Sequence, residues 1–289
     1  MSAFLTVSIT ENCRLDELLR ERFYLSRHNL YLCKQEERLI LNGTPVRNDC
    51  DLHPGDQLLF DYHKEEPISC RPVSFDLKIL YEDDLILVVD KPIGYIIHYD
   101  GTEQCRKDNP QTVNNFVAGY YKKTGQKHGV YSLHRLDRDT SGCLLYCKES
   151  LMVGCFSHAM ETKQIRRTYL ALVEGVLRKS RIIDKPIGRD RHVSNRFRIS
   201  ATGKSAVTEV TPLSSNKSAT LVSCRLQTGR THQIRVHLSS IGHPVVGDVL
   251  YGAKENKRLM LHSHMVEFYS PLVNEMVSVT CPPEDSFTL

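Results

Sequence analysis

The stretch Tyr131–Lys148, YSLHRLDRDTSGCLLYCK, joins a dense group of charged side chains to an apolar run. A histidine, two arginines and two aspartates are followed by a Thr-Ser-Gly turn and then by the apolar segment Cys143–Cys147. A short apolar run bounded by turn residues is typical of a buried strand. The charged residues are therefore expected on a loop held by rigid structure, where binding and catalytic residues concentrate.

The overall composition is that of an ordinary folded protein. The chain of 289 residues is 40% hydrophobic and 25% charged, which suits one large domain or two unequal ones. No apolar run approaches the roughly 18 residues of a membrane span, and Met1–Ile9 lacks the features of a signal peptide. We therefore expect a cytoplasmic protein without a membrane partner. The ten cysteines are scattered without a CxxC pair, so reduced and mostly buried thiols are expected.

Basic side chains gather in one part of the chain, although the net charge is only +4. Between Lys163 and Lys204, twelve Lys and Arg residues are opposed by three acidic residues. Such a local excess is typical of a protein that binds a polyanion. A solvated surface that happens to be rich in arginine explains the same pattern equally well.

Residues 1–62 have the pattern of a small separate unit. Arg14–Phe23 has apolar residues at helical spacing, and Ser26 can cap a second helix that runs to about Arg38. The Asn42-Gly43 pair between short apolar runs indicates a hairpin. A further turn precedes the strand predicted at Gln57–Asp61.

Residues 63–78 read as a linker, and residues 79–289 as a second domain rich in strands. Helices are expected at Val113–Tyr121, at Leu151–Gln164 with Ser150 as its cap, and at about Thr231–Ile241. The expected strands are Ile79–Tyr81, Leu85–Val89, Cys143–Cys147, Thr168–Val173, Val207–Val210, Ala219–Leu226, Leu259–Phe268 and Met276–Thr280. Many strands, neighbouring hairpins and few helices predict an α+β fold with a largely antiparallel sheet.

Several common sites are excluded by their spacing. The chain contains neither GxGxxG nor GxSxG, and the Gly203-Lys204-Ser205 segment lacks the first glycine of a phosphate loop. The later histidines do not have the spacing of a known metal motif. We therefore expect no metal site, and hydrogen-bonding roles for His232, His237, His243, His262 and His264.

Asp137 is a candidate for chemistry on a sugar-linked substrate, because a carboxylate can serve as nucleophile or base there. From the residues alone, the choice between Asp137 and Asp139 stays open, since a lone aspartate can also be a loop cap or a surface charge, the explanation we keep for Asp139. Tyr169, on a predicted strand, is by itself best explained as a core residue.

Three motifs in order resemble those of the RluA-type pseudouridine synthases, which convert uridine in structured RNA to its C-glycoside isomer. The segment His134–Gly142, HRLDRDTSG, resembles their signature. Arg166–Ala171 resembles their basic-x-Tyr-x-Ala strand, and Thr228–His237 matches TGRTHQIRVH at every position. The opening strand within Ile86–His98 and the segment Gly242–Gly252 extend the resemblance over the second domain.

The resemblance implies catalytic roles for three residues. Asp137 matches the essential aspartate, which attacks or deprotonates the nucleoside so that the glycosidic bond breaks. Tyr169 matches an active-site tyrosine that packs on the base, and Arg235 matches the basic residue paired with the aspartate. A nearby arginine favours an ionised carboxylate.

The same motifs imply RNA contacts. Arg135 matches the residue that fills the stack vacated by a flipped uridine. His134 is expected either to touch the phosphate backbone or to brace the loop. Thr140, Arg230 and Gln233 are expected to bind substrate.

Residues 1–62 resemble the α-L RNA-binding domain of small-subunit ribosomal proteins, which is also fused to many RluA-type synthases. Arg27, Lys34 and Arg38 are spaced to share one helix face, which would meet RNA phosphates. Acidic residues outnumber basic ones in this segment, whereas such domains are normally basic.

The sequence therefore predicts a monomeric RNA pseudouridine synthase that needs no cofactor. The expected substrate is large-subunit ribosomal RNA, with transfer RNA as the alternative. Two rival hypotheses are a non-catalytic RNA-binding or ribosome-assembly factor and a glycosylase that releases the base.

Overall fold

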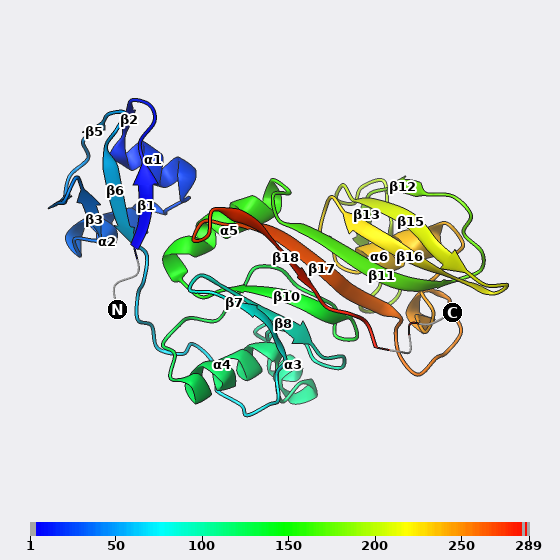
Figure 1. Ribbon diagram of the computed structural model, residues 1–289. Coiled ribbons are helices and arrows are strands. Elements are labelled where there is room, and N and C mark those ends of the chain that lie inside the picture. Colours follow the sequence, from blue (N-terminus) through cyan, green and yellow to red (C-terminus); the bar gives the residue numbers. More distant parts are fainter. Residues whose placement is uncertain (1–3, 285–286, 288–289) are drawn as a thin grey trace.

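The computed structural model describes residues 4–284 and 287, and its strands form two main sheets (Figure 1). The first is a four-stranded antiparallel sheet in the order β1-β6-β3-β4. A short pairing of β2 with β5 and two helices complete this N-terminal unit. Its elements are β1 (Phe4–Ser8), β2 (Cys13–Arg14), α1 (Leu15–Arg22), α2 (Arg27–Gln35), β3 (Leu39–Leu41), β4 (Thr44–Pro45), β5 (Asp51–Leu52) and β6 (Gln57–Asp61).

Capping and turn residues in the sequence explain most of the helices and strands of the N-terminal unit. The Ser26 hydroxyl caps α2 by accepting a hydrogen bond from the Asn29 N–H at 3.1 Å. The predicted hairpin turns at Asn42 and Gly43, which both have positive φ, as a type I′ turn requires. The predicted strand at Gln57–Asp61 is confirmed.

The second helix is shorter than predicted. It ends at Gln35 because Glu37 takes a left-handed conformation, with φ of 55°, and the Arg38 N–H then closes the helix end on the Cys33 carbonyl at 2.9 Å. Arg38 therefore does not lie on a helix face with Arg27 and Lys34, which corrects that prediction. Strand β1 had not been predicted.

The second sheet has ten strands, in the order β12-β15-β16-β11-β17-β10-β8-β7, with β18 added to β17 and β9 added to β10. Among the strand pairs of this sheet in the described residues, only β10 with β17 is parallel, so the predicted α+β fold with a largely antiparallel sheet is confirmed. Its strands are β7 (Ile79–Glu82), β8 (Ile86–Lys91), β9 (Tyr131–Ser132), β10 (Ser141–Cys147), β11 (Arg166–Glu174), β12 (Arg181–Asp184), β15 (Val207–Ser215), β16 (Ala219–Leu226), β17 (Leu261–Ser270) and β18 (Glu275–Thr280).

The remaining elements lie beside this sheet. They are α3 (Glu103–Asp108), α4 (Val113–Thr124), the short helix η1 (Ser150–Met152), α5 (Val153–Glu161), the hairpin β13 (Ile187–Arg189) and β14 (Phe197–Ile199), α6 (Gln233–Ser240) and the short helix η2 (Val249–Tyr251). Ser150 is not the predicted cap of a long helix, because a tight 3₁₀ turn closed by the Met152 N–H on the Glu149 carbonyl precedes α5. No helix in the described part of the chain is long and apolar enough to cross a membrane.

The central strands are buried on both faces, as the apolar run of β10 predicted. Leu144 and Tyr146 pack on the face covered by α4, and Cys143, Leu145 and Cys147 pack on the opposite face. The hydrophobic core of that opposite face also includes residues of the N-terminal unit. The two sheets are thus joined by apolar packing, and the ring of Tyr24 stacks on that of His158 with centroids 3.8 Å apart.

Candidate active site

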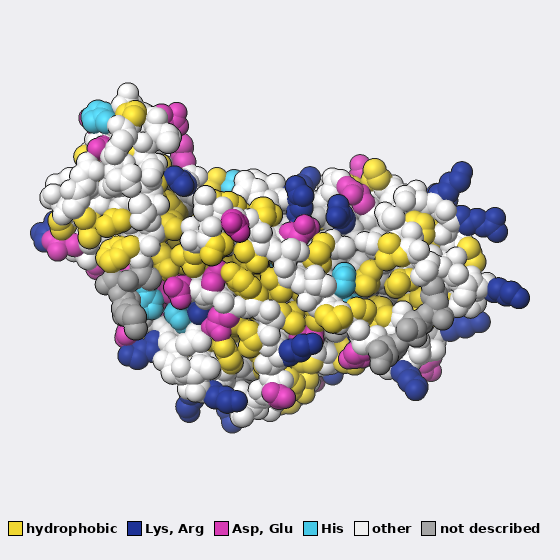
Figure 2. All heavy atoms as spheres, in the orientation of Figure 1, with side chains coloured by type: hydrophobic (Ala, Val, Ile, Leu, Met, Phe, Trp, Pro, Cys, Tyr) yellow, Lys and Arg dark blue, Asp and Glu magenta, His cyan; other side chains and the backbone are white. Residues whose placement is uncertain are grey.

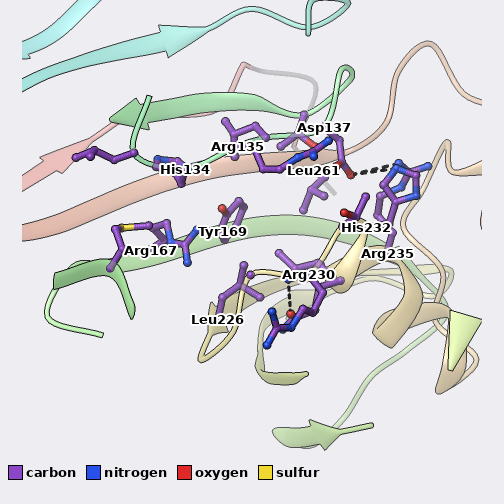
Figure 3. A pocket seen from close by; sticks show the side chains of 18 of the residues that line it. His134, Arg135, Asp137, Arg167, Tyr169, Leu226, Arg230, His232, Arg235 and Leu261 are labelled. Carbon is purple, nitrogen blue, oxygen red and sulfur yellow. Dashed lines mark hydrogen bonds and ion pairs between the residues drawn. The ribbon is translucent and has the colours of Figure 1, made fainter. Parts of the chain in front are cut away.

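A cavity of about 260 Å³ lies where the loop before β10, strand β11 and the start of α6 meet (Figure 3). Asp137 lies on the loop, Tyr169 on the strand and Arg235 on the helix, and all three line the cavity. The cavity adjoins a wider groove of about 970 Å³ that Asp137 and Arg235 also line. Three segments far apart in the sequence are thus brought to one place.

The loop that carries Asp137 is held by a buried lysine. The ammonium group of Lys91, which is fully buried, donates hydrogen bonds to the carbonyls of Pro92, Arg138 and Thr140 at 2.8–2.9 Å. Burial lowers the pKa of Lys91 to about 7. Because two of these carbonyls belong to residues one and three positions after Asp137, Lys91 fixes the backbone that follows the carboxylate. The sequence analysis did not identify this role.

Asp137 and Arg235 face each other. Nη1 of Arg235 lies 3.3 Å from Oδ2 of Asp137, and their side chains are 12% and 16% exposed, respectively. Arg235 is held more tightly by Asp248, whose two carboxylate oxygens accept hydrogen bonds from Nε and Nη2 at 2.7 and 2.8 Å. The guanidinium also lies over the Tyr251 ring, 5.0 Å from its centroid.

Asp248 therefore anchors Arg235, while Asp137 takes one weaker bond from it. Burial acts to lower the pKa of Arg235, but the hydrogen bonds and charge of Asp248, joined by Asp137, outweigh that effect and raise it. Asp248 is only 2% exposed, at the border of the wider groove, and both of its carboxylate oxygens are engaged with Arg235. Sequence reasoning missed Asp248, whose only signal was its place in the matched segment Gly242–Gly252.

His232, at the start of α6, lies near the same carboxylate oxygen of Asp137 as Arg235 does. Its Nε2 lies 3.9 Å from Oδ2 of Asp137, and its Nδ1 lies 2.9 Å from the Tyr251 hydroxyl. Burial lowers the pKa of His232, so the ring is neutral near pH 7. Its φ of 57° is left-handed, and such strain is often retained at functional sites.

Tyr169 and Arg167 line the cavity from β11. A register shift between Thr168 and Tyr169 interrupts the pairing of β11 with β17, and irregularities of this kind re-aim side chains. Burial raises the pKa of the Tyr169 phenol above its usual value, so the hydroxyl stays protonated. Arg167 forms no ion pair with the described residues, and its Nε is buried without a partner there. Its cation therefore remains available to an anionic substrate.

Of the other residues predicted to line the cavity, some are exposed to solvent and others hold the surrounding loops in place. Arg135 and Arg230 are exposed at the cavity, although Nε of Arg230 donates to the Ser205 carbonyl at 2.9 Å. His134 braces the loop, because its Nε2 accepts a hydrogen bond from the Leu145 N–H at 3.2 Å. Burial, with Arg167 nearby, lowers the pKa of His134 to about 3. A neutral ring of this kind does not supply the charge for a phosphate contact.

Gln233 and Thr140 are buried beneath the cavity surface, 3% and 2% exposed, respectively. The Gln233 amide donates to the Val207 carbonyl and accepts from the Arg230 N–H, both at 3.0 Å. Its amide is thus engaged with the protein and braces the start of α6, at the border of the cavity that Gln233 also lines. The Thr140 hydroxyl is buried without a partner among the described residues.

The predicted basic face of the N-terminal unit is largely neutralised. Lys34 forms an ion pair with Asp16, and Arg38 forms ion pairs with Glu36 at 2.6 Å and Asp61 at 3.7 Å. Arg27 is exposed and forms no ion pair among the described residues. None of these three basic residues lines the active-site cavity.

The five later histidines make hydrogen bonds, as expected. His237 bonds to Thr208 and the Lys185 carbonyl, and His262 bonds to Ser141 and the Cys281 carbonyl. His243 and His264 bond to carbonyl oxygens at 2.8 Å. In the part of the chain that the structure describes, no group with metal-ligand spacing includes any of them.

Comparison with known families adds a match that covers most of the second sheet. Residues 85–240, which include Asp137, Tyr169 and Arg235, match the family described as RNA pseudouridylate synthase. A Bacillus subtilis protein named "Uncharacterized RNA pseudouridine synthase YhcT" is 38% identical over 85% of this chain and 82% of its own length. A Xanthomonas campestris protein named "Ribosomal large subunit pseudouridine synthase D" is 31% identical over 94% of this chain and 86% of its own length.

Solved structures give the same picture of the fold. The structure titled "Human RNA Pseudouridylate Synthase Domain Containing 1" superimposes with a TM-score of 0.59 at 26% identity, over 76% of this chain and 89% of that one. The structure titled "Human RNA Pseudouridylate Synthase Domain Containing 4" has a TM-score of 0.60 at 23% identity, over 73% and 90% of the two chains.

Proposed function

This chain belongs to the RNA pseudouridylate synthase family, and from that premise we propose that it isomerises uridine in large-subunit ribosomal RNA with Asp137 as the catalytic residue. The substrate proposal is supported by relatives named as large-subunit pseudouridine synthases, one of them 31% identical over 94% of this chain. The observation that carries the catalytic proposal is the pairing of Asp137 with Arg235 in a cavity that Tyr169 also lines.

The reaction is internal to the substrate. The bond from C1′ to N1 of the uracil breaks and a bond from C1′ to C5 forms, while C5 loses a proton and N1 gains one. Asp137 attacks or deprotonates the nucleoside, and both roles require an ionised carboxylate. Arg235 stabilises that charge with the hydrogen bond to Oδ2. Asp248 keeps the guanidinium in place by its two shorter bonds.

The cavity suits a single base turned out of the RNA stack. Tyr169 offers a ring against which a uracil can pack, a contact worth about 1–3 kcal/mol, and the apolar side chains of Leu226 and Leu261 line the same space. Its protonated hydroxyl can donate a hydrogen bond to a base carbonyl. Flipping costs a few kcal/mol, and exposed Arg135 at the entrance is placed to fill the vacated stack.

The wider groove supplies contacts for the flanking RNA backbone. Its lining includes Arg235 and five further basic side chains, Arg135, Arg138, Arg189, Lys257 and Arg258, of which Arg258 is paired with Glu284. Figure 2 shows further Lys and Arg side chains projecting from the end of the molecule that carries β12, β13 and β15. Such side chains bind phosphates and make affinity depend on salt. We propose that the excess of Lys and Arg between residues 163 and 204 binds the phosphates of the RNA backbone.

We extend the proposal to the N-terminal unit and to the setting of the protein. Residues 1–62 act as an RNA-binding domain of the α-L type, joined by residues 63–78 to the catalytic domain at 79–289. Of the three basic residues predicted to contact RNA from this unit, Arg27 is the one that is exposed and forms no ion pair among the described residues. The protein works as a cytoplasmic monomer.

The substrate proposal is tested by mapping pseudouridine in a strain that lacks the gene. Large-subunit ribosomal RNA should lose pseudouridine at one or more sites, and the wild-type gene, but not a D137N gene, should restore them. Loss confined to transfer RNA would contradict the ribosomal assignment. Unchanged pseudouridine in both RNAs would favour a binding factor, and free uracil in a purified reaction would indicate a glycosylase.

A further inference from the structure

Three side chains from distant segments meet where the chain leaves the N-terminal unit. His63 follows β6, His128 follows α4 and Glu149 follows β10, and Figure 1 shows the linker descending from β6 toward α4. Nδ1 of His63 lies 2.8 Å from Oε1 of Glu149, and Nδ1 of His128 lies 3.1 Å from the same oxygen. The ligand atoms all lie within 4.8 Å of one another, and none of the three residues lines the active-site cavity.

The Glu149 carboxyl group is buried and has no lysine or arginine side chain as a partner among the described residues. Its side chain is 1% exposed, and its ion-pair partners among the described residues are His63 and His128. Oε2 accepts a hydrogen bond from the Lys64 backbone N–H at 3.1 Å. A buried carboxylate without a positive partner is strongly destabilising. In its ionised form Glu149 needs a positive partner, which a metal ion held by the two imidazoles supplies.

The geometry of His128 favours the metal. Its Nδ1 is buried and has no hydrogen-bond partner among the described residues, although the Glu149 oxygen lies only 3.1 Å away. The ring is therefore not aligned to donate to that oxygen. A buried polar atom that is left unpaired in this way requires an explanation, and an ion between the two groups provides one.

The donor set identifies the ion. Two imidazole nitrogens and one carboxylate oxygen form a three-residue Zn²⁺ site that leaves a fourth position for water. Zinc–ligand distances of about 2.0–2.2 Å place tetrahedral ligands about 3.3–3.6 Å apart. The His63–Glu149 distance of 2.8 Å is that of a hydrogen bond and the His128–Glu149 distance is 3.1 Å, so these side chains separate by a few tenths of an ångström when they take up the ion. The Lys64 N–H on Oε2 fixes the carboxylate, as outer contacts do for metal ligands.

We propose that His63, His128 and Glu149 bind one Zn²⁺, which fastens the linker to the catalytic region. Because His63 lies two residues after β6, the ion holds the N-terminal unit beside the sheet that carries the active site. The proposal concerns folding and domain placement, and it does not depend on which RNA is modified.

Zinc binding is measured on the full-length protein after treatment with a chelator and dialysis. Isothermal titration with Zn²⁺ alone compares wild type with H63N and H128N. The asparagine amide can still donate a hydrogen bond to Glu149 but is a poor zinc ligand. H28N, at an exposed histidine of α2, is the matched control. Circular dichroism without zinc first verifies that each variant is folded.

Wild type and H28N should bind one Zn²⁺ per chain, and each cluster variant should bind at least about 10-fold more weakly. Zinc should raise the thermal midpoint of wild type and H28N by more than that of the cluster variants at the same zinc concentration. Equal zinc binding by H63N, H128N and wild type would overturn the proposal, as would absence of stoichiometric binding to wild type. The latter result would identify a hydrogen-bonded His-Glu-His group.

A measurement on zinc-loaded wild type keeps the proposal testable if a variant fails to fold. X-ray absorption at the zinc edge should show a nitrogen and oxygen shell at about 2.0–2.1 Å without sulfur. A sulfur shell at about 2.3 Å would place the ion on the cysteines and refute the assignment.

Discussion

The D248N substitution tests whether Arg235 works because it is anchored. Asp248 accepts hydrogen bonds from Nε and Nη2 of Arg235 at 2.7 and 2.8 Å, whereas Asp137 accepts one from Nη1 at 3.3 Å. Asparagine keeps one oxygen acceptor but directs an amide N–H₂ at the guanidinium. The variant therefore loses one charge-assisted bond and the compensating charge, while the shape of the side chain is preserved.

The size of the effect follows from that lost bond. A hydrogen bond to a charged group contributes about 1.5–3 kcal/mol. If this energy holds the guanidinium in the arrangement that serves Asp137, its loss reduces the rate of the chemical step by about 10- to 150-fold. RNA affinity should change by less than about 3-fold, because Asp248 is 2% exposed and both of its carboxylate oxygens are engaged with Arg235.

The assay is single-turnover release of tritium from C5 of labelled uridine in RNA, with RNA affinity measured separately by filter binding. D49N is the matched control, since Asp49 accepts two hydrogen bonds from Arg14, at 2.7 and 3.0 Å, in the N-terminal unit away from the cavity. D49N should react at the wild-type rate. A folded D248N protein that releases tritium as fast as wild type would refute the anchoring role.

Three further predictions concern the base, the loop and the N-terminal unit. Y169A should weaken binding of the target RNA or slow its reaction by about 1–3 kcal/mol, through loss of the stacked ring; unchanged kcat/KM would exclude Tyr169 from the base-binding surface. His134 has a pKa lowered to about 3 in the folded protein from an ordinary 6.5, so the unfolded chain binds its proton first as the pH falls. The free energy of unfolding should therefore drop below pH 6.5 by up to about 1.4 kcal/mol per pH unit relative to H134Q, measured by urea titration; parallel pH profiles of the two proteins would contradict a bracing role. Deletion of residues 1–62 should weaken binding to structured RNA more at low salt than at high salt, and equal affinity of both proteins at every salt concentration would argue against an RNA-binding unit.

Strong local signals made much of the fold predictable from the sequence. The apolar run at Cys143–Cys147 lies within β10, and the turn residues Asn42 and Gly43 set the first hairpin. Strand β1 was missed because nothing in Phe4–Ser8 marks its partner, β6, about fifty residues away. The hairpin of β13 and β14 was missed because its arginine-rich sequence has little apolar periodicity.

The active site was predictable only in part, and for a physical reason. The resemblance named Asp137, Tyr169 and Arg235, and the fold brings them to one cavity. The residues that hold them in place, such as Lys91 and Asp248, act through contacts between segments far apart in the chain. No local pattern encodes such contacts. The same limit applies to Arg38, which lies outside the helix because α2 ends at Gln35, before the left-handed residue Glu37.

The most direct test of the catalytic assignment compares D137N with D139N on the same RNA under single-turnover conditions. Asp139 is an exposed aspartate two residues along the same loop, so D139N controls for a change of charge there. We predict that D137N binds the RNA but forms pseudouridine on the order of 10³-fold more slowly or not at all, whereas D139N stays within about 3-fold of wild type. Pseudouridine formation by D137N at the wild-type rate would contradict the account.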